Sequence, residues 1–362
     1  MARAADAAAE ARASAATDNA GMHMLLLDGS ALPAGWYARE LQAGRLPRLR
    51  RLLRLGEVIA RGPAVADVEA AWLSPAELWL QRALELAAAP DGAAQQLPWG
   101  ALAAVGGGLQ ACGPHWALAL PVHLALGHDS VQLADPATLD IDEAQSRDLL
   151  DAVLPLLQEE GWQVQLLSPG CWLLAHVALR GVRTADPWRA IGRNAAGWMP
   201  GGAQAAHWRR LLTEVQMVWL DHPVNLARAA RGQPQINSLW LHGCGALAQP
   251  PRSPFVLAEA QAAQPPAGSC AWRIALQAAL PALPRTAEAD VLEVLQPAPT
   301  AEDDAAAIDG AIEAVLLPAL RRDGAARLVL AGSRSWVDLR LRRAGGWRIW
   351  SRGPAPEALA QV

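Results

Sequence analysis

Three polar side chains at positions 222, 225 and 228 have the types and the spacing of an anion-binding site. His222, Asn225 and Arg228 follow one another at intervals of three residues, and this spacing places side chains on one side of a helix. All three can donate hydrogen bonds, and a helix N-terminus attracts negative charge. The pattern indicates a pocket for a small phosphorylated or anionic ligand. The alternative is that the same groups cap the helix or bond to the backbone, as polar residues at turns often do.

Further residues around this motif complete the candidate ligand-binding set. Three of the four Asn residues in the chain are Asn194, Asn225 and Asn237, and each has helix capping as its alternative role. Arg193 has the reach to hold a phosphate, although an ion pair is the alternative. All 31 basic residues are Arg. Any phosphate would therefore be held by guanidinium groups, backbone amides or a metal.

An acidic residue ends the first apolar run of the chain. Residues 22–27 are apolar apart from His23, and Asp28, Gly29 and Ser30 follow them. The run predicts a buried parallel strand that carries Asp28 to its carboxyl end. Ligands bind at this edge of open α/β sheets.

Helices and strands are expected to alternate on both sides of one insertion. Before the insertion we expect helices over 39–55 and 75–88. Within it we expect strands over 116–126, 130–133, 163–167 and 171–178, with a helix over 142–160. After it we expect a helix over 207–220, a loop over 221–234 and a strand over 236–241, and then a Pro-rich connection over 250–269. The last part predicts a strand over 291–295, a helix over 301–322, a strand over 327–330 and a hairpin of 335–342 with 347–351.

This order predicts an α/β fold with a doubly wound, mostly parallel sheet and a small inserted α+β domain. We assign residues 1–21 to a flexible leader, 22–114 and 186–362 to the core, and 115–185 to the inserted cap domain.

Composition excludes several classes of protein. The net charge is −4 and the pI is about 6.1, so the chain lacks the basic character of a nucleic-acid-binding protein. No apolar run has the length of a membrane span, and the Ala-rich leader has no signal-peptide core. The four Cys residues form no CxxC pair, which argues against a zinc knuckle. We expect a cytoplasmic protein without nucleic-acid or membrane partners, and the sequence identifies no protein partner.

Several segments together resemble the archaeal type of cofactor-independent phosphoglycerate mutase, within the alkaline phosphatase superfamily. They are Met24-Leu-Leu-Leu-Asp28-Gly29, the helix from Leu46 to Gly56, His222-Pro-Val-Asn225-Leu-Ala-Arg228, and Asn237-Ser-Leu-Trp240-Leu-His-Gly243-Cys-Gly245. The resemblance covers roughly residues 22–340 and is best in the middle. It implies an alkaline phosphatase-like core and phosphoryl transfer through a phosphoserine with two divalent metals.

The chain departs from the family pattern at the chemically active positions. In the family the nucleophilic Ser lies in a loop that corresponds to residues 62–67, and here Ala66 takes its place. Because that position has no hydroxyl group, the covalent phosphoserine intermediate cannot form there. The acid-rich run after the late strand is replaced by residues 293–300, and the late Asp-His pair by Ala331-Gly332-Ser333. Asp28 and Asp67 remain as vestigial metal ligands, too few for two hard cations.

Two hypotheses follow from the sequence. The first is a degenerate bacterial relative without catalytic activity, which binds a ligand or regulates a partner and needs no cofactor. The second is an active phosphoglycerate mutase, an isomerase, or a related phosphohydrolase that uses two Mn²⁺ or Mg²⁺ ions.

Overall fold

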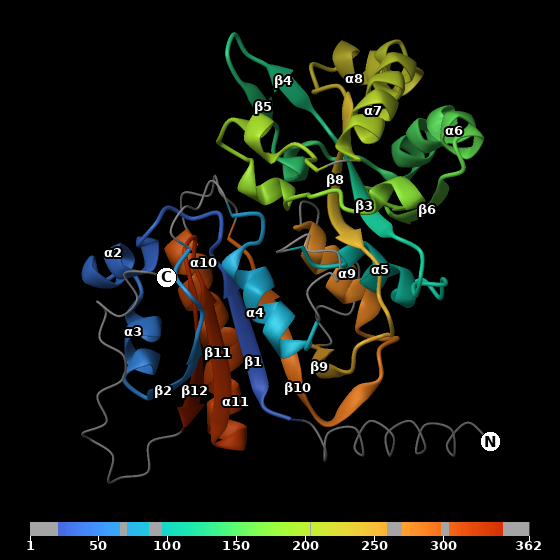
Figure 1. Cartoon of the computed structure of the whole chain (residues 1–362). Coiled ribbons are helices and arrows are strands. Elements are labelled where there is room, and N and C mark those ends of the chain that lie inside the picture. Colours follow the sequence, from blue (N-terminus) through green and yellow to red (C-terminus); the bar gives the residue numbers. More distant parts are fainter. Residues whose placement is uncertain are drawn as a thin grey trace, which may run out of the picture.

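The computed structural model describes residues 21–65, 71–86, 96–202, 204–258, 270–297, 304–342 and 362. A six-stranded sheet in the order β2-β12-β11-β1-β10-β9 forms its centre (Figure 1). Its strands are β1 (His23–Asp28), β2 (Gly56–Arg61), β9 (Ser253–Leu257), β10 (Arg285–Leu295), β11 (Ala325–Ala331) and β12 (Trp336–Arg342). The strand β12 is antiparallel to both of its neighbours, and the other pairs of the sheet are parallel. The mostly parallel sheet in a mixed α/β chain confirms the predicted fold class.

Both faces of the sheet are covered, because β1 is apolar on both sides. Met24 and Leu26 join one buried cluster, whereas Leu25 and Leu27 join another, as expected from the alternation of side chains along a strand. The first cluster includes α4 (Pro75–Ala83) and α9 (Ala271–Ala279). The second includes α2 (Trp36–Gln42), α3 (Pro47–Leu53), α10 (Asp304–Ala311) and α11 (Leu317–Asp323).

Two helices that we expected to be regular are interrupted. The helix expected over 39–55 is divided into α2 and α3, because Gly44 has a φ of 76° and Pro47 starts the second helix. The helix expected over 301–322 contains a π-helical segment, η6 (Ile312–Leu316), directly before α11. Pro318 lies at the start of α11, and its missing N–H removes a regular helical hydrogen bond there.

The inserted part forms a second, antiparallel sheet in the order β6-β7-β3-β8, above the carboxyl end of β1 in Figure 1. The inserted part of the chain contains β3 (Trp116–Val122), β4 (Leu124–Leu126), β5 (Val131–Leu133), α6 (Glu143–Glu159), β6 (Gln163–Ser168) and β7 (Cys171–Ala175). After it come α7 (Ala205–Leu220), α8 (Pro223–Ala230) and β8 (Ser238–Gly245). Short 3-10 helices lie at Pro136–Thr138, Val177–Leu179, Pro187–Arg189 and Ala195–Trp198.

The second sheet extends further along the chain than the boundary at residue 185 implied. β8 pairs with β3, so the strand that we had placed in the core belongs to the inserted sheet. Trp208 and Trp219 of α7 lie in the same buried cluster as Trp172 of β7. The apolar face of α7 therefore packs on the inserted sheet. The expected loop over 221–234 contains α8, which begins at Pro223.

Helix α5 (Trp99–Gly106), which periodicity did not predict, joins the two parts. It contacts α9 on the core side and β3 and β8 on the inserted side. Two glycines permit this approach. A methyl group on Gly100 would lie 2.5 Å from the Cα of Ala117, and one on Gly106 would lie 2.1 Å from the carbonyl oxygen of Ala278.

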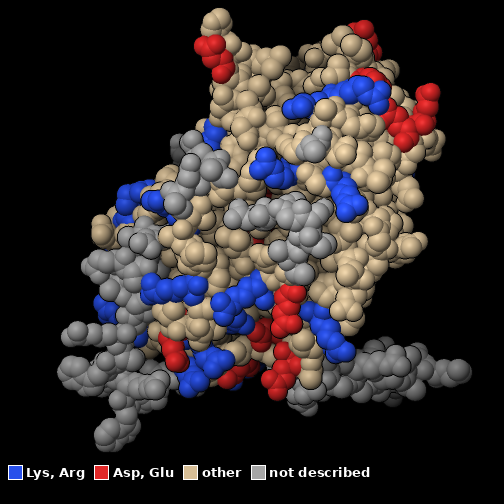
Figure 2. Space-filling model, in the orientation of Figure 1, with Lys and Arg blue, Asp and Glu red and all other residues tan. Residues whose placement is uncertain are grey.

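Some sequence predictions lie outside the described residues. They are the leader apart from residue 21 and the second hairpin strand over 347–351. Among the helices that the structure describes, none is long and apolar enough to cross a membrane. On the face shown in Figure 2, the Arg residues drawn in blue are interspersed with acidic ones, with no continuous basic area among the coloured residues.

A stack of aromatic rings connects α7 with the ends of β6 and β7. The ring of Trp162 is stacked on His176 with centroids 4.5 Å apart, and His176 is stacked on His207 at 5.6 Å. Oε2 of Glu160 lies 3.3 Å from Nε2 of His207, and Glu160 forms an ion pair with Arg210. Burial lowers the pKa of His176 and the neighbouring His207 lowers it further, while Glu160 opposes both. The neutral imidazole of His176 is therefore favoured in the folded protein.

We expect Gly106→Ala to lower the free energy of unfolding by about 1–3 kcal/mol, because the added methyl group forces α5 away from α9. Gly107→Ala is the matched control, since the nearest atom to its added methyl group lies at 3.6 Å. Urea denaturation of both variants measures the difference. Equal stability of the two variants would show that the α5–α9 contact is looser than described.

The stacked histidine predicts a dependence of stability on pH. The pKa of His176 is lower in the folded state than in the unfolded chain. Its contribution to the free energy of unfolding is therefore complete above the unfolded pKa near 6.5 and is lost as the pH falls through the folded pKa. His176→Asn keeps an acceptor for the Ala178 N–H, which His176 Nδ1 accepts at 3.1 Å. This variant should lose less stability than the wild type between pH 8 and pH 5 in urea titrations. Identical pH profiles would contradict the assignment.

Candidate functional site

A pocket lies where the carboxyl end of β1 meets the segment that returns from the inserted sheet. Its cavity volume is about 10 Å³, which is room for roughly one water molecule, and it is partly open to solvent. Its core side includes Asp28, Ser30 and Trp272, and its other side includes Asp186, Trp188 and Arg189. The sequence argument placed Asp28 at this edge, and the structure puts its carboxyl group in the pocket wall, 3% exposed.

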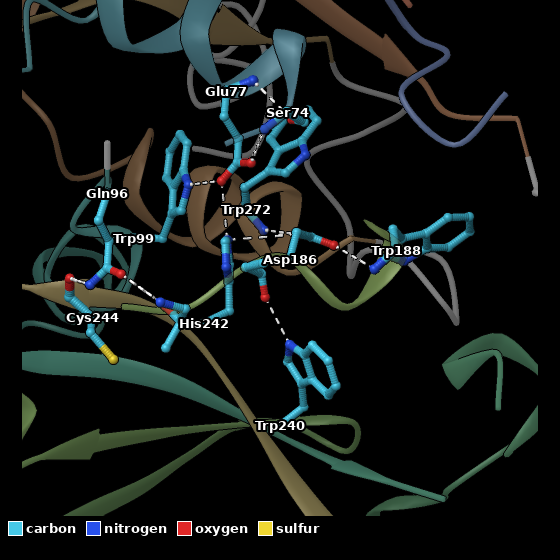
Figure 3. A network of polar contacts seen from close by, with 12 residues as sticks. Ser74, Glu77, Gln96, Trp99, Asp186, Trp188, Trp240, His242, Cys244 and Trp272 are labelled. Atoms are coloured by element: carbon cyan, nitrogen blue, oxygen red, sulfur yellow. Dashed lines mark hydrogen bonds and ion pairs between the residues drawn. The ribbon is translucent and has the colours of Figure 1, made fainter. Parts of the chain in front are cut away.

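At the pocket wall, three buried ionisable residues from separate elements meet, and Asp186 is itself part of that wall (Figure 3). Glu77 belongs to α4, Asp186 precedes a 3-10 helix, and His242 lies on β8. The Nε2 atom of His242 lies 3.2 Å from Oε1 of Glu77 and 3.7 Å from Oδ2 of Asp186. All three side chains are at most 3% exposed, so their charges must compensate one another.

Local hydrogen bonds fix the carboxylate of Glu77. Its Oε2 accepts the Ser74 N–H at 2.8 Å, while the Ser74 hydroxyl accepts the Glu77 N–H at 3.2 Å. This reciprocal pair is a capping box that begins α4. Oε1 of Glu77 accepts the indole N–H of Trp99 at 2.8 Å. The cap of one helix thus delivers a carboxylate to the junction with the inserted sheet.

The electrostatic balance favours a protonated His242. Burial alone would lower its pKa, but Glu77 and Asp186 more than offset this and raise it. Burial alone would raise the pKa of Glu77, but the hydrogen bond and the charge of His242 lower it below its ordinary value. Burial raises the pKa of Asp186, and the repulsion of Glu77 raises it further, whereas the attraction of His242 lowers it. The cluster is an ion pair of His242 with Glu77, and Asp186 lies beside it.

Hydrogen bonds also hold Asp186 and Asp28. Oδ1 of Asp186 accepts the Trp188 N–H at 3.0 Å, and Oδ2 faces the Trp272 N–H at 3.4 Å. Oδ1 of Asp28 accepts the N–H and the hydroxyl of Ser30. Burial raises the pKa of Asp28 to about 6, although the Ser30 hydrogen bonds oppose the rise.

The described residues do not fit a site for two divalent metals. Within those parts of the chain, no group of three or more His, Cys, Asp or Glu side chains is placed to hold a metal ion. Of the two predicted metal ligands, the structure describes Asp28, whose carboxylate accepts a hydrogen bond from Ser30. Ala66 and Asp67 lie outside the described residues. Hard cations such as Mn²⁺ and Mg²⁺ need several oxygen donors.

The motif at positions 222–228 lies in the inserted part, on and before α8. The Asn225 amide donates to the carbonyl groups of Trp219 at 2.8 Å and Ile236 at 2.7 Å, and its oxygen accepts the Ile236 N–H at 2.7 Å. His222 is the N-cap of α8, where Nδ1 accepts the Val224 N–H at 3.3 Å. These contacts have the form of the scaffold alternative.

Arg228 is also occupied by the protein. Its guanidinium group donates to the carbonyl oxygens of Pro234 at 2.8 Å and Leu139 at 2.5 Å, and to the Gln145 side chain at 2.8 Å. The side chain is buried. It therefore ties α8 to the start of α6.

The remaining predicted ligand residues do not gather at one site, although Arg193 and Asn194 are adjacent in the chain. Asn237 bonds to both the N–H and the carbonyl group of Leu124, at 2.8 and 2.9 Å. Asn194 caps a 3-10 helix through the Ala196 N–H. Arg193 is half-buried, and its charge lowers the pKa of Arg189 after the larger effect of burial. Of the set, Arg193 interacts electrostatically with a residue of the pocket wall.

Sequence reasoning placed Asp28 at the site and quoted His242 within a motif, but it gave no role to Glu77, Asp186 or His242. Glu77, Asp186 and His242 are separated by more than fifty positions each, so no local spacing connects them. A signal for Glu77 was present, because Ser74 and Glu77 have the spacing of a capping box. It indicated the start of a helix but not the burial of the acid.

Fold and pocket together define an α/β protein with a candidate binding site at the carboxyl edge of a mostly parallel sheet, where such proteins bind ligands. No family model and no curated protein matches the sequence. Among solved structures, a cofactor-independent phosphoglycerate mutase from Thermoplasma acidophilum is similar at 14% identity, with 93% of this chain and 94% of that chain covered and a TM-score of 0.42. The PH0037 protein from Pyrococcus horikoshii is similar at 13% identity, with 94% and 92% covered and a TM-score of 0.47. Function must therefore be inferred from the residues of the site.

Asn225→Ala tests whether the motif is scaffold or ligand site. The change leaves backbone groups of Trp219 and Ile236 without partners in the interior, so we expect a loss of about 2–4 kcal/mol in the free energy of unfolding. His222→Ala removes one capping bond and should cost about 1 kcal/mol or less. Urea denaturation gives both values, and calorimetry with inorganic phosphate gives the binding. Unchanged stability together with lost phosphate binding would favour the ligand site.

Proposed function

We propose that this protein is a phosphoglycerate mutase-like protein that has lost phosphoryl-transfer activity and acts as a binding or regulatory protein. The proposal is carried by Ala66, which the family resemblance aligns with the nucleophilic Ser of phosphoglycerate mutases. A side chain without a hydroxyl cannot accept the phosphoryl group.

The two hydroxyl groups of the pocket wall support the same conclusion. The Ser30 hydroxyl donates to Asp28 in a local turn, and the Ser74 hydroxyl accepts the first-turn N–H of Glu77. Both have structural partners, and neither lies in the segment that corresponds to the nucleophile loop. The donor set around Asp28 among the described residues supports this proposal further, because it is too small for a pair of metal ions.

The pocket beside Asp28 is the binding site that this proposal requires. It lies at the sheet edge that binds ligands in open α/β folds, and it lies between the core and the segment that returns from the inserted sheet. A ligand there would contact both parts of the molecule. This arrangement suits a protein that reports the presence of a small molecule to a partner.

The competing function is an active, metal-dependent phosphoglycerate mutase, which the retained Asp28 favours. We expect no interconversion of 3- and 2-phosphoglycerate above the buffer rate, with or without added Mn²⁺. Metal analysis of the purified protein should find fewer than two tightly held divalent ions per chain. Turnover that disappears in Asp28→Ala would overturn the proposal. Ala66→Ser is the informative companion, because a gain of activity would locate the lost nucleophile.

A further inference from the structure

Helix α8 turns its polar side chains inward and its apolar side chains outward. Asn225 and Arg228 are buried on its inner side. The positions of the opposite side are exposed and carry only apolar side chains, at the i, i+3, i+4 and i+7 spacing of one helix face: Pro223, Leu226, Ala227 and Ala230. An amphipathic helix of a folded domain normally turns its apolar stripe toward the core. The orientation of α8 is reversed, so its apolar face meets solvent in the described part of the chain.

The end of α7 extends this apolar face. Met217 is 72% exposed, Leu220 is 66% exposed and Leu226 of α8 is 54% exposed. Of the seven exposed large hydrophobic side chains among the described residues, four lie between positions 217 and 226. Both helices lie at the top of the molecule in Figure 1, away from the core sheet. We call this area the α7–α8 surface and define it as Met217, Leu220, Pro223, Leu226, Ala227 and Ala230. Exposed apolar areas of this kind mark interaction surfaces.

Opposite charges stand at the two ends of α8. Asp221 precedes the helix, and Arg231 is its C-cap. Both residues are exposed, and neither side chain has an ion pair or a side-chain hydrogen bond with a described residue. Leu226 lies midway between them, five positions from each. The α7–α8 surface therefore has one unpaired negative charge and one unpaired positive charge, placed evenly about its centre.

A second copy of the chain matches this charge pattern. In a two-fold contact the same surface is used by both subunits. If two α8 helices pack antiparallel with the axis near Leu226, each Asp221 lies at the end of its helix that faces Arg231 of the partner subunit. The small side chains of Ala227 and Ala230 allow a close approach of the helices, because interaxial distance depends on the side chains at the contact. A helix that lies on a membrane instead needs several basic residues beside its apolar face, and here one base is matched by one acid.

We propose that the α7–α8 surface is the interface of a homodimer, in which the α8 helices of two copies pack antiparallel and Asp221 of each copy pairs with Arg231 of the partner subunit. The proposal depends neither on the pocket beside Asp28 nor on the loss of phosphoryl-transfer activity.

The mass of the full chain in solution tests the apolar part of this interface. At about 50 µM, sedimentation equilibrium should give twice the monomer mass of 38.3 kDa. Leu226→Asp places two carboxylates together at the axis and should give a monomer at the same concentration. Ile59→Asp is the matched control, since Ile59 is also exposed, at 40%, but lies on β2 of the core, and this variant should remain a dimer. Circular dichroism checks the fold of both variants.

A monomeric wild type would overturn the proposal, and so would a dimer that survives Leu226→Asp. A monomeric chain whose α7–α8 surface binds a different protein would also overturn it, because the occupant would not be a second copy.

A charge exchange tests the antiparallel arrangement. Asp221→Arg and Arg231→Asp each bring like charges together at both ends of the interface, so each should raise the dimer dissociation constant at least about tenfold. The double variant Asp221→Arg with Arg231→Asp restores opposite charges and should return to within about threefold of the wild type. In the double variant both charges oppose the dipole of α8, so an effect on the helix alone would make the loss larger. A double variant as weak as the single variants would overturn the proposed pairing.

Discussion

Three buried ionisable side chains, a histidine and two carboxylates, meet at the junction of the two sheets. His242 comes from the inserted sheet, Glu77 from a helix of the core, and Asp186 from the connection between them. Each charge alone would be costly in the interior, and together they compensate. Removal of one partner of such a group costs about 3–5 kcal/mol, because the remaining charge stays buried. The relative position of the two sheets is therefore set by charge as well as by apolar packing.

Neutral hydrogen bonds continue this constraint along the returning chain. Trp240 on β8 donates to the carbonyl group of Ala185 at 2.7 Å, and Gln96 donates to Val182 and accepts from the Thr184 N–H, both at 2.7 Å. The segment before Asp186 thus has fixed partners on both sides (Figure 3). Asp186, Trp188 and Arg189 follow it immediately, so the pocket wall inherits its position from this network.

The sequence was informative where one element decides the structure. The apolar run before Asp28 predicted a buried strand with an acid at its carboxyl end, and β1 confirms it. Helix α5 was missed because its sequence is apolar all round, which leaves no periodicity to detect. β9 lies in a Pro- and Ala-rich stretch that was interpreted as a connection. The ion cluster could not be predicted, because burial of Glu77 and His242 depends on packing between distant segments.

The motif at positions 222–228 shows how a pattern that suits anion binding can also build a scaffold. Asn225 and Arg228 direct their donors to backbone carbonyl groups that α8 and its neighbours leave without partners, and buried carbonyl groups need such donors. An anion site needs donors that protein groups do not already use and a surplus of positive charge. Beside Asp28, the indole N–H of Trp188 is a donor without a described partner, but the buried acids there match the buried bases.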